Sequence, residues 1–328
     1  HYMLNNDTIA AATPSLYADN GMLCPVDGFP IEMYINDSYW GLYTLNIKKE
    51  RKNYNLDKKN EKQVFMEIGE NSTLTTSGFK WTDGEIRNPK DIVCMDGSAY
   101  DGENPKEPID ATSQYYDPNN SKHVKTAAVK SYWLTFLTNV TNTTSNTTKD
   151  EWKTFVNHDD FIDDLLASAF FDHSDNWCNN GFFCTWDAQH WSALLYDMDI
   201  TFGIAWDNYN PGYKEYYPYN HDERQTKAFP HLPWLSRFQT CFWDEIKDRY
   251  AQLRRVGIFS AENVVKLMED FSRKVGSAVY ADDTARWPYP SFGNPPSGEA
   301  IFYDSVQRVE AWISKRIGYL DARYSYNQ

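Results

Sequence analysis

The chain has 328 residues, of which 41% are hydrophobic and 16% aromatic, and its formal net charge is -14. This length allows one large domain or two lobes that share a cleft, and the aromatic content argues against a disordered chain. The negative charge argues against a nucleic-acid partner unless the chain has a local basic patch. The one basic run, at residues 48–52, is short and is followed by residues of mixed charge, so it is interpreted as a solvated strand end.

Several other classes of protein are excluded by what the sequence lacks. There is no apolar run of about 18 residues, so no membrane span is predicted. Five scattered cysteines without a Cys-x-x-Cys pair argue against zinc and against a complete disulfide framework. Cys178 and Cys184 could pair across a hairpin, but free buried thiols are favoured. The chain begins with His1 rather than Met, which indicates a fragment, a processed product or the remnant of a tag, and a chain that is part of a larger chain or assembly is expected.

Strand patterns dominate the first part of the chain. Residues 31–35 alternate between apolar and polar side chains, and residues 39–45 are rich in strand formers after a short polar turn, which predicts a hairpin. Residues 64–68 and 84–87 are two further candidate strands. Together they predict a small antiparallel sheet over residues 28–95.

Helical spacing of apolar residues dominates the second part. The polar stretch 138–148 is predicted as a loop, and Ser260 as the N-cap of a helix. The predicted helices cover residues 125–140, about 160–171, 234–255, 261–275 and about 297–322.

The order of these elements predicts an α+β fold with two lobes. A lead-in segment at residues 1–27 precedes a strand-rich N-lobe at residues 28–121. The end of that lobe, residues 96–121, is a long connection rich in Asp, Pro and Asn. A helical C-lobe, residues 122–328, carries the candidate site.

Acids and amides cluster in the aromatic stretch 172–203, which is costly unless they bind a metal, a polar ligand or one another. Asp175 stands five positions before Asn180, and Asp197 and Asp199 follow an apolar strand pattern. In protein kinases a base Asp stands five residues before a metal-binding Asn, and a later Asp holds Mg²⁺ over the phosphates. The order here fits that arrangement, whereas dinucleotide-binding, Walker, serine-hydrolase and zinc-protease motifs are absent.

Each of these features has a second interpretation. The spacing of Asp175 and Asn180 alone favours turn caps between a helix and a strand. Asp197 and Asp199 fit a structural Ca²⁺ site or a capped strand end as well as they fit catalysis.

Four motifs in the same order along the chain resemble the spore-coat CotH kinase family. Residues 34–43 are similar to its Tyr-Ile-Asn-Gly hairpin, and residues 64–68 and 85–89 resemble its next two strands. Residues 175–203 look like its acidic core, which ends in Thr-Phe-Gly, and residues 309–320 look like its closing helix. The resemblance covers most of the chain.

The resemblance implies an atypical kinase fold that binds ATP with Mg²⁺ and phosphorylates Ser or Thr of a protein substrate. Asp175 would be the catalytic base. Asn180 and Asp197 would be metal ligands, with Asp199 supporting or sharing that role. The remaining acids of the stretch, Asp172 and Asp187, are predicted to be caps or surface residues.

Glu67, Arg87 and Asn180 are the implied nucleotide-binding residues. The chain departs from the family pattern at Ile47, where a Glu is usual, and at Arg87, where a Lys is usual; Arg and Lys differ in how they bind phosphate. These departures support a second hypothesis, a non-catalytic structural or adhesion module that keeps the kinase-like scaffold. A third hypothesis is a Ca²⁺-stabilised carbohydrate binder that uses the aromatic residues of 206–219.

The resemblance is nearest to gut-bacterial surface proteins and to phage structural proteins. It therefore implies a virion or a secreted or cell-surface location rather than the cytoplasm. The expected partner is a protein substrate or an assembly partner.

Overall fold

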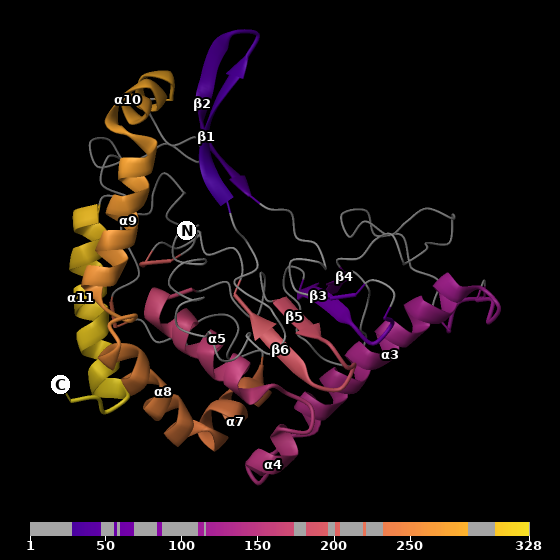
Figure 1. The fold of residues 1–328 in the computed structure, drawn as a ribbon. Coiled ribbons are helices and arrows are strands. Elements are labelled where there is room, and N and C mark those ends of the chain that lie inside the picture. The colour runs from indigo at the N-terminus through magenta and orange to yellow at the C-terminus, as the bar shows by residue number, and fades with distance from the viewer. Residues whose placement is uncertain are drawn as a thin grey trace, which may run out of the picture.

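The structure is a computed structural model, and every structural statement below concerns the residues that it describes. These are residues 28–46, 56–57, 60–68, 84–86, 111–114, 116–173, 182–195, 201–203, 219–220, 232–287 and 306–327. They form an antiparallel sheet, a separate hairpin and a set of helices, which confirms the α+β class (Figure 1).

A four-stranded antiparallel sheet has the strand order β4-β3-β5-β6. Its strands are β3 (Val64–Ile68), β4 (Gly84–Ile86), β5 (Phe182–Thr185) and β6 (Trp191–Leu194). Val64 of β3 lies opposite Thr185 of β5, and the pairing continues along both strands. The prediction of one sheet over residues 28–95 is therefore wrong, because β3 completes its hydrogen bonds with a strand from the second half of the chain.

The predicted hairpin forms a separate two-stranded sheet from β1 (Gly28–Ile35) and β2 (Ser38–Asn46). Asn36 and Asp37 connect the strands with φ of 50° and 61°. Asn and Asp tolerate this left-handed conformation, and two such residues in succession match the twist of a hairpin. In Figure 1 the hairpin projects away from the four-stranded sheet and lies beside α10 (Ser277–Arg286).

The helices follow the predicted periodicity with three differences. The predicted helix 234–255 is two helices, because the chain bends at Phe242, where φ is -101° and ψ is 19°. The helix predicted over residues 125–140 extends to Asn142, into the stretch predicted as a loop, and an unpredicted short helix directly after that stretch starts at a capping box between Thr148 and Glu151. α10 is the third. The remaining helices are α3 (Ser121–Asn142), α4 (Lys149–Trp152), α5 (His158–Phe171), α7 (Pro233–Cys241), α8 (Trp243–Arg255), α9 (Ala261–Val275) and α11 (Val306–Arg323).

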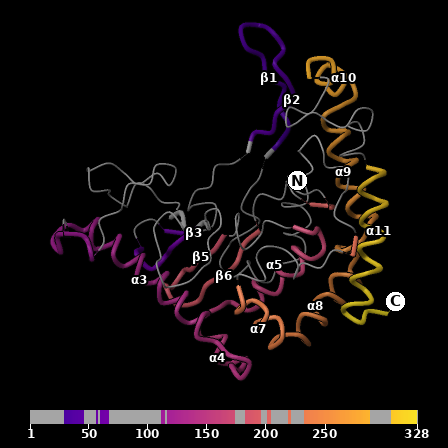
Figure 2. Tube along the Cα trace, turned by 180° about the vertical axis from the view of Figure 1, so that it is seen from behind, coloured from indigo at the N-terminus to yellow at the C-terminus, as the bar shows by residue number. Residues whose placement is uncertain are grey.

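The main core lies where α3 and α5 meet the sheet. The Trp133 ring of α3 packs against Phe183 of β5 and Trp191 of β6 at centroid distances of 5.6 and 5.0 Å, and all three side chains are buried. Residues 160–171 of α5 are buried around the whole helix, because α5 contacts β6, α8 and α11 (Figure 2). This central helix leads the chain into the acidic stretch.

Two further predictions concern cysteines and membranes. Cys184 of β5 is a free and fully buried thiol, as predicted, and burial raises its pKa. Cys178 lies outside the described residues. Within the described ranges, no helix combines the length and the apolar character that crossing a membrane requires.

Candidate functional site

Most of the predicted site residues belong to segments that the structure does not describe. Glu67 lies in β3, where its backbone pairs with Glu85 of β4 on one side and with Phe182 of β5 on the other. The predicted residues outside the described ranges are Arg87, Asp175, Asn180, Asp197 and Asp199. Their roles therefore stay predictions. The structure describes the residues on either side of the segments that contain Asp175, Asn180, Asp197 and Asp199.

The described residues that flank the two acidic segments, 174–181 and 196–200, meet at two places. At the sheet, Phe182 follows the first segment and pairs with Leu194, which lies just before the second. At the end of α5, the Phe202 N–H donates to the Phe171 carbonyl oxygen at 2.7 Å. The ends of both segments are thus held between the same two anchors, the β5–β6 pair and the C-terminal end of α5.

The anchor at α5 is built on Asp172, which ends the helix in the left-handed conformation with φ 56° and ψ 49°. The backbone N–H groups of Asp172 and His173 both donate to the Ser168 carbonyl oxygen. Asp is one of the few residues with a side chain that adopt this conformation readily. Asp172 is 1% exposed, which confirms that it is a helix cap and shows that the cap is buried.

A buried arginine of α11 supports this helix end. Arg316 is fully buried, and its guanidinium donates to the carbonyl oxygens of Ala169 at 2.8 Å and Tyr219 at 3.0 Å. One of its nitrogens lies 3.8 Å from the Asp172 carboxylate, and both side chains are excluded from solvent. The cation therefore offsets both a buried carboxylate and the partial negative charge at the C-terminal end of a helix.

Residues 201–203, which follow the second acidic segment, are also held by α11. Arg308 donates from Nη1 to the Phe202 carbonyl oxygen at 2.9 Å. The Phe202 ring packs edge-on against Phe171 of α5 and Trp312 of α11. Phe202 and Gly203 both have positive φ, 54° and 79°, so the chain turns sharply directly after Thr201. One helix thus holds both sides of the anchor.

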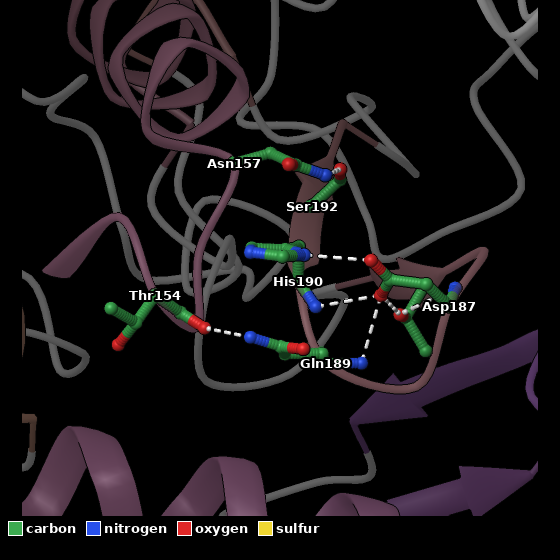
Figure 3. Close-up of polar contacts among 7 residues, drawn as sticks. Thr154, Asn157, Asp187, Gln189, His190 and Ser192 are labelled. Carbon is green, nitrogen blue, oxygen red and sulfur yellow. Dashed lines mark hydrogen bonds and ion pairs between the residues drawn. The ribbon is translucent and has the colours of Figure 1, made fainter.

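The tip of the β5–β6 hairpin carries a polar cluster, shown in Figure 3. Asp187 accepts hydrogen bonds from the backbone N–H groups of Gln189 and His190, both at 2.8 Å, and contacts His190 Nδ1 at 2.7 Å. Burial raises the pKa of Asp187, but these hydrogen bonds outweigh it and leave the pKa below its usual value. The Gln189 side chain donates to the Thr154 carbonyl oxygen. Asp187 is therefore a turn cap, as predicted.

A second polar group lies between α5 and β6. Asn157 donates to Ser192 Oγ at 2.7 Å (Figure 3), and Ser192 in turn hydrogen-bonds Asp160. Asp160 is 5% exposed, and within the described part of the chain its Oδ1 has no hydrogen-bond partner. Burial raises the pKa of Asp160 from 3.8 to about 7, the bond from Ser192 opposes the rise, and Asp163 and Asp159 add to it.

This pKa predicts that stability decreases as pH rises. Below about pH 4, Asp160 is protonated in both states, whereas between pH 4 and pH 7 only the native state keeps the proton. The stabilisation is therefore lost progressively as pH rises from about 4 to about 7, by up to about 4 kcal/mol in total. Urea unfolding at pH 5 and pH 8 should show a smaller loss for Asp160→Asn than for wild type.

The matched control for that comparison is Asp248→Asn, since Asp248 is an exposed acid on α8 and is not among the groups that raise the pKa of Asp160. It should lose as much stability as wild type between the two pH values. Equal losses in wild type and Asp160→Asn would contradict the assignment of this pH dependence to Asp160.

Sequence reasoning did not identify Arg316, Arg308 or Asp160. A signal for Arg316 was present, because it lies between Ile313 and Ile317 on the apolar stripe of the last helix. Within the described residues, no group of three or more His, Cys, Asp or Glu side chains could hold a metal ion. The predicted ligands are one amide and two carboxylates, the oxygen donors that Mg²⁺ prefers, so the donor set fits this ion.

Comparison with known proteins identifies one family. A family model described as CotH kinase protein matches residues 14–320, which is most of the chain. The match includes the hairpin, the sheet, α5 and most of α11, and therefore every element that anchors the two acidic segments. A search of curated proteins found no match.

Proposed function

Because the chain belongs to the CotH kinase family, we propose that it is a protein kinase module that transfers the γ-phosphate of ATP to Ser or Thr of a protein. The proposal includes the two-lobe arrangement, in which a strand-rich part closes over a helical part. The observation that carries it is the shared anchoring of the two acidic segments by the β5–β6 pair and the end of α5. Groups that act on one phosphate have to converge, and common anchors favour convergence.

The chemistry assigns a role to each predicted residue. Asp175 accepts the proton of the attacking hydroxyl group, and Asn180, Asp197 and Asp199 supply oxygen ligands for Mg²⁺. Bound magnesium neutralises the charge that develops on the phosphates. Glu67 and Arg87 contact the nucleotide from the strand-rich side.

The support from α11 matters because phosphoryl transfer depends mainly on positioning and electrostatics. Arg308 holds the backbone three residues after Asp199, and Arg316 holds the helix end three residues before Asp175. Both arginines act on backbone or caps, so they are positioning residues in this proposal rather than catalytic residues.

The direct test is thermal unfolding with ATP and magnesium. We expect ATP with Mg²⁺ to raise Tm by several degrees, because ligand at about 100 times Kd stabilises by about 2.7 kcal/mol. ATP with EDTA and Mg²⁺ alone are the two controls, and each should give a much smaller shift. No shift with ATP and Mg²⁺ together would count against nucleotide binding.

A second candidate is a non-catalytic structural or adhesion module of a phage particle or cell surface. The observation that favours it is the replacement of two residues usual in the family by Ile47 and Arg87, both on the proposed nucleotide side. This candidate predicts no magnesium-dependent shift. It also predicts that the chain is a stoichiometric component of a particle or surface assembly.

A further inference from the structure

The outer edge of β2 is covered by side chains of α10 and of Trp287, the C-cap residue that directly follows this helix. The Leu42 N–H donates to Asp283 Oδ1 at 2.7 Å, and Trp287 Nε1 donates to the Trp40 carbonyl oxygen at 2.7 Å. Trp40 and Leu42 are alternate residues, so these two groups point from the same edge of the strand. Asp283 and Trp287 are four positions apart on one side of the helix, and together they replace the strand that would otherwise pair with this edge.

The close approach of α10 depends on Gly41, which lies between the two bonded groups. Its φ is +147°, which residues with side chains rarely adopt. A Cβ atom at this position would lie 2.9 Å from Trp287 Nε1 and 3.2 Å from Asp283 Oδ1. A side chain here would therefore displace both hydrogen-bonding groups, so glycine is required for the contact.

Arg286 adds a cation–π contact on the same side. Its guanidinium lies 4.9 Å from the Trp40 ring centroid and 4.5 Å from that of Trp287, and the two rings meet edge to face. Trp40 is 37% exposed and Trp287 is 40% exposed, and α10 has no buried residue. The contact is therefore specific but shallow, a combination that favours a reversible interaction.

The contact joins distant parts of the chain. Leu42 and Asp283 are 241 positions apart, and α10 follows α9, which packs against α11. α11 also carries Arg308 and Arg316, which hold the anchor of the acidic segments. A continuous set of contacts therefore runs from the hairpin through α10, α9 and α11 to the candidate site.

We propose that α10 is a positioning element that fixes the β1–β2 hairpin relative to the helical part and thereby sets the affinity for the nucleotide. The second half of this statement rests on the proposed kinase function. In kinases the strand-rich part covers the phosphates that the helical part positions, so the relative placement of the two parts affects nucleotide binding. Asp283 and Trp287 are the positioning residues.

The first experiment measures the hairpin contact without any reference to catalysis. Asp283→Ala removes the acceptor for the Leu42 N–H, and we expect amide hydrogen exchange at Leu42 to become at least tenfold faster. Asp283→Asn keeps an acceptor oxygen and should restore most of the protection. The matched control is Asp282→Ala at the exposed neighbouring position, which should leave exchange at Leu42 unchanged.

A second variant tests the close approach from the other side. Gly41→Ala should also accelerate exchange at Leu42, because the added Cβ displaces Trp287 and Asp283. Its control is Gly318→Ala on α11, where nothing lies within 4 Å of the added Cβ. Protection of the β5 amides in every variant shows that the core is intact. Unchanged exchange at Leu42 in both Asp283→Ala and Gly41→Ala would overturn the proposal.

The second experiment compares KM for ATP with kcat. We expect Asp283→Ala to raise KM by about three- to tenfold while kcat changes less than twofold, with recovery in Asp283→Asn. If Asp283→Ala accelerates amide exchange at Leu42 but leaves KM for ATP unchanged, the proposal that α10 sets the affinity for the nucleotide is overturned. If wild type binds no ATP and has no activity, the proposed function fails, whereas the exchange data still decide whether α10 positions the hairpin.

Discussion

Autophosphorylation with radiolabelled ATP is expected to be lost when Asp175 or Asp197 is replaced by alanine. Removal of a general base typically lowers a rate by about 10² to 10⁴-fold. Loss of a carboxylate that holds Mg²⁺ leaves the phosphate charge without its main counter-ion, so an effect at least as large is expected. Initial rates at saturating ATP and Mg²⁺ measure both effects.

The control for this comparison is Asp248→Ala, because Asp248 is an exposed acid on α8. It should keep wild-type activity. Each variant should also keep the Tm of the wild-type protein without ligand, so that loss of activity is not loss of folding. Activity equal to wild type in both Asp175→Ala and Asp197→Ala would disprove the two residue assignments.

Arg316→Met is expected to destabilise the protein by about 3–5 kcal/mol, because it removes one partner of a buried ion pair. Methionine approximates the volume of the side chain, so the effect reports the lost charge and hydrogen bonds rather than a cavity. The Asp172 carboxylate loses this buried cation, and the carbonyl oxygens of Ala169 and Tyr219 lose a donor. Urea unfolding at pH 7 measures the change.

Two further variants separate charge from packing at this position. Arg255→Met, at an exposed position in the last turn of α8, should change stability by less than about 0.5 kcal/mol. Adding Asp172→Asn to Arg316→Met should recover part of the loss, since the buried negative charge is then also removed. A change below about 1 kcal/mol in Arg316→Met would show that the ion pair contributes little.

The elements that the sequence predicted well are those with a regular apolar spacing or a clear turn or cap residue. The hairpin, β3, α5 and α9 follow their predicted ranges closely, and Ser260 caps α9 by accepting from the Asn263 N–H. α10 was missed because it buries no residue and so carries no apolar stripe. The break at Phe242 was missed because the apolar spacing continues through it, while its buried ring packs on Phe238.

The sequence predicted which acidic and amide residues form the candidate site, but it did not predict the arginines of α11 that hold the surrounding backbone. The order of Asp175, Asn180 and Asp197 is a local pattern that resemblance to a family can identify. Arg308 and Arg316 are separated from that stretch by more than a hundred positions in the chain. Their partners are mainly backbone carbonyl oxygens, which carry no residue-specific signal. Such contacts depend on the three-dimensional packing of α11 on α5.

The pairing of β3 with β5 has a consequence for the order of folding. Residues 64–67 of β3 pair on one edge with residues 182–185 of β5. This edge of β3 therefore stays unpaired until about a third more of the chain has been synthesised. β3 can pair with β4 earlier, but closing the longer loop between β3 and β5 costs additional entropy, which slows folding. During synthesis β3 therefore has an unpaired edge, which is the kind of surface that chaperones protect.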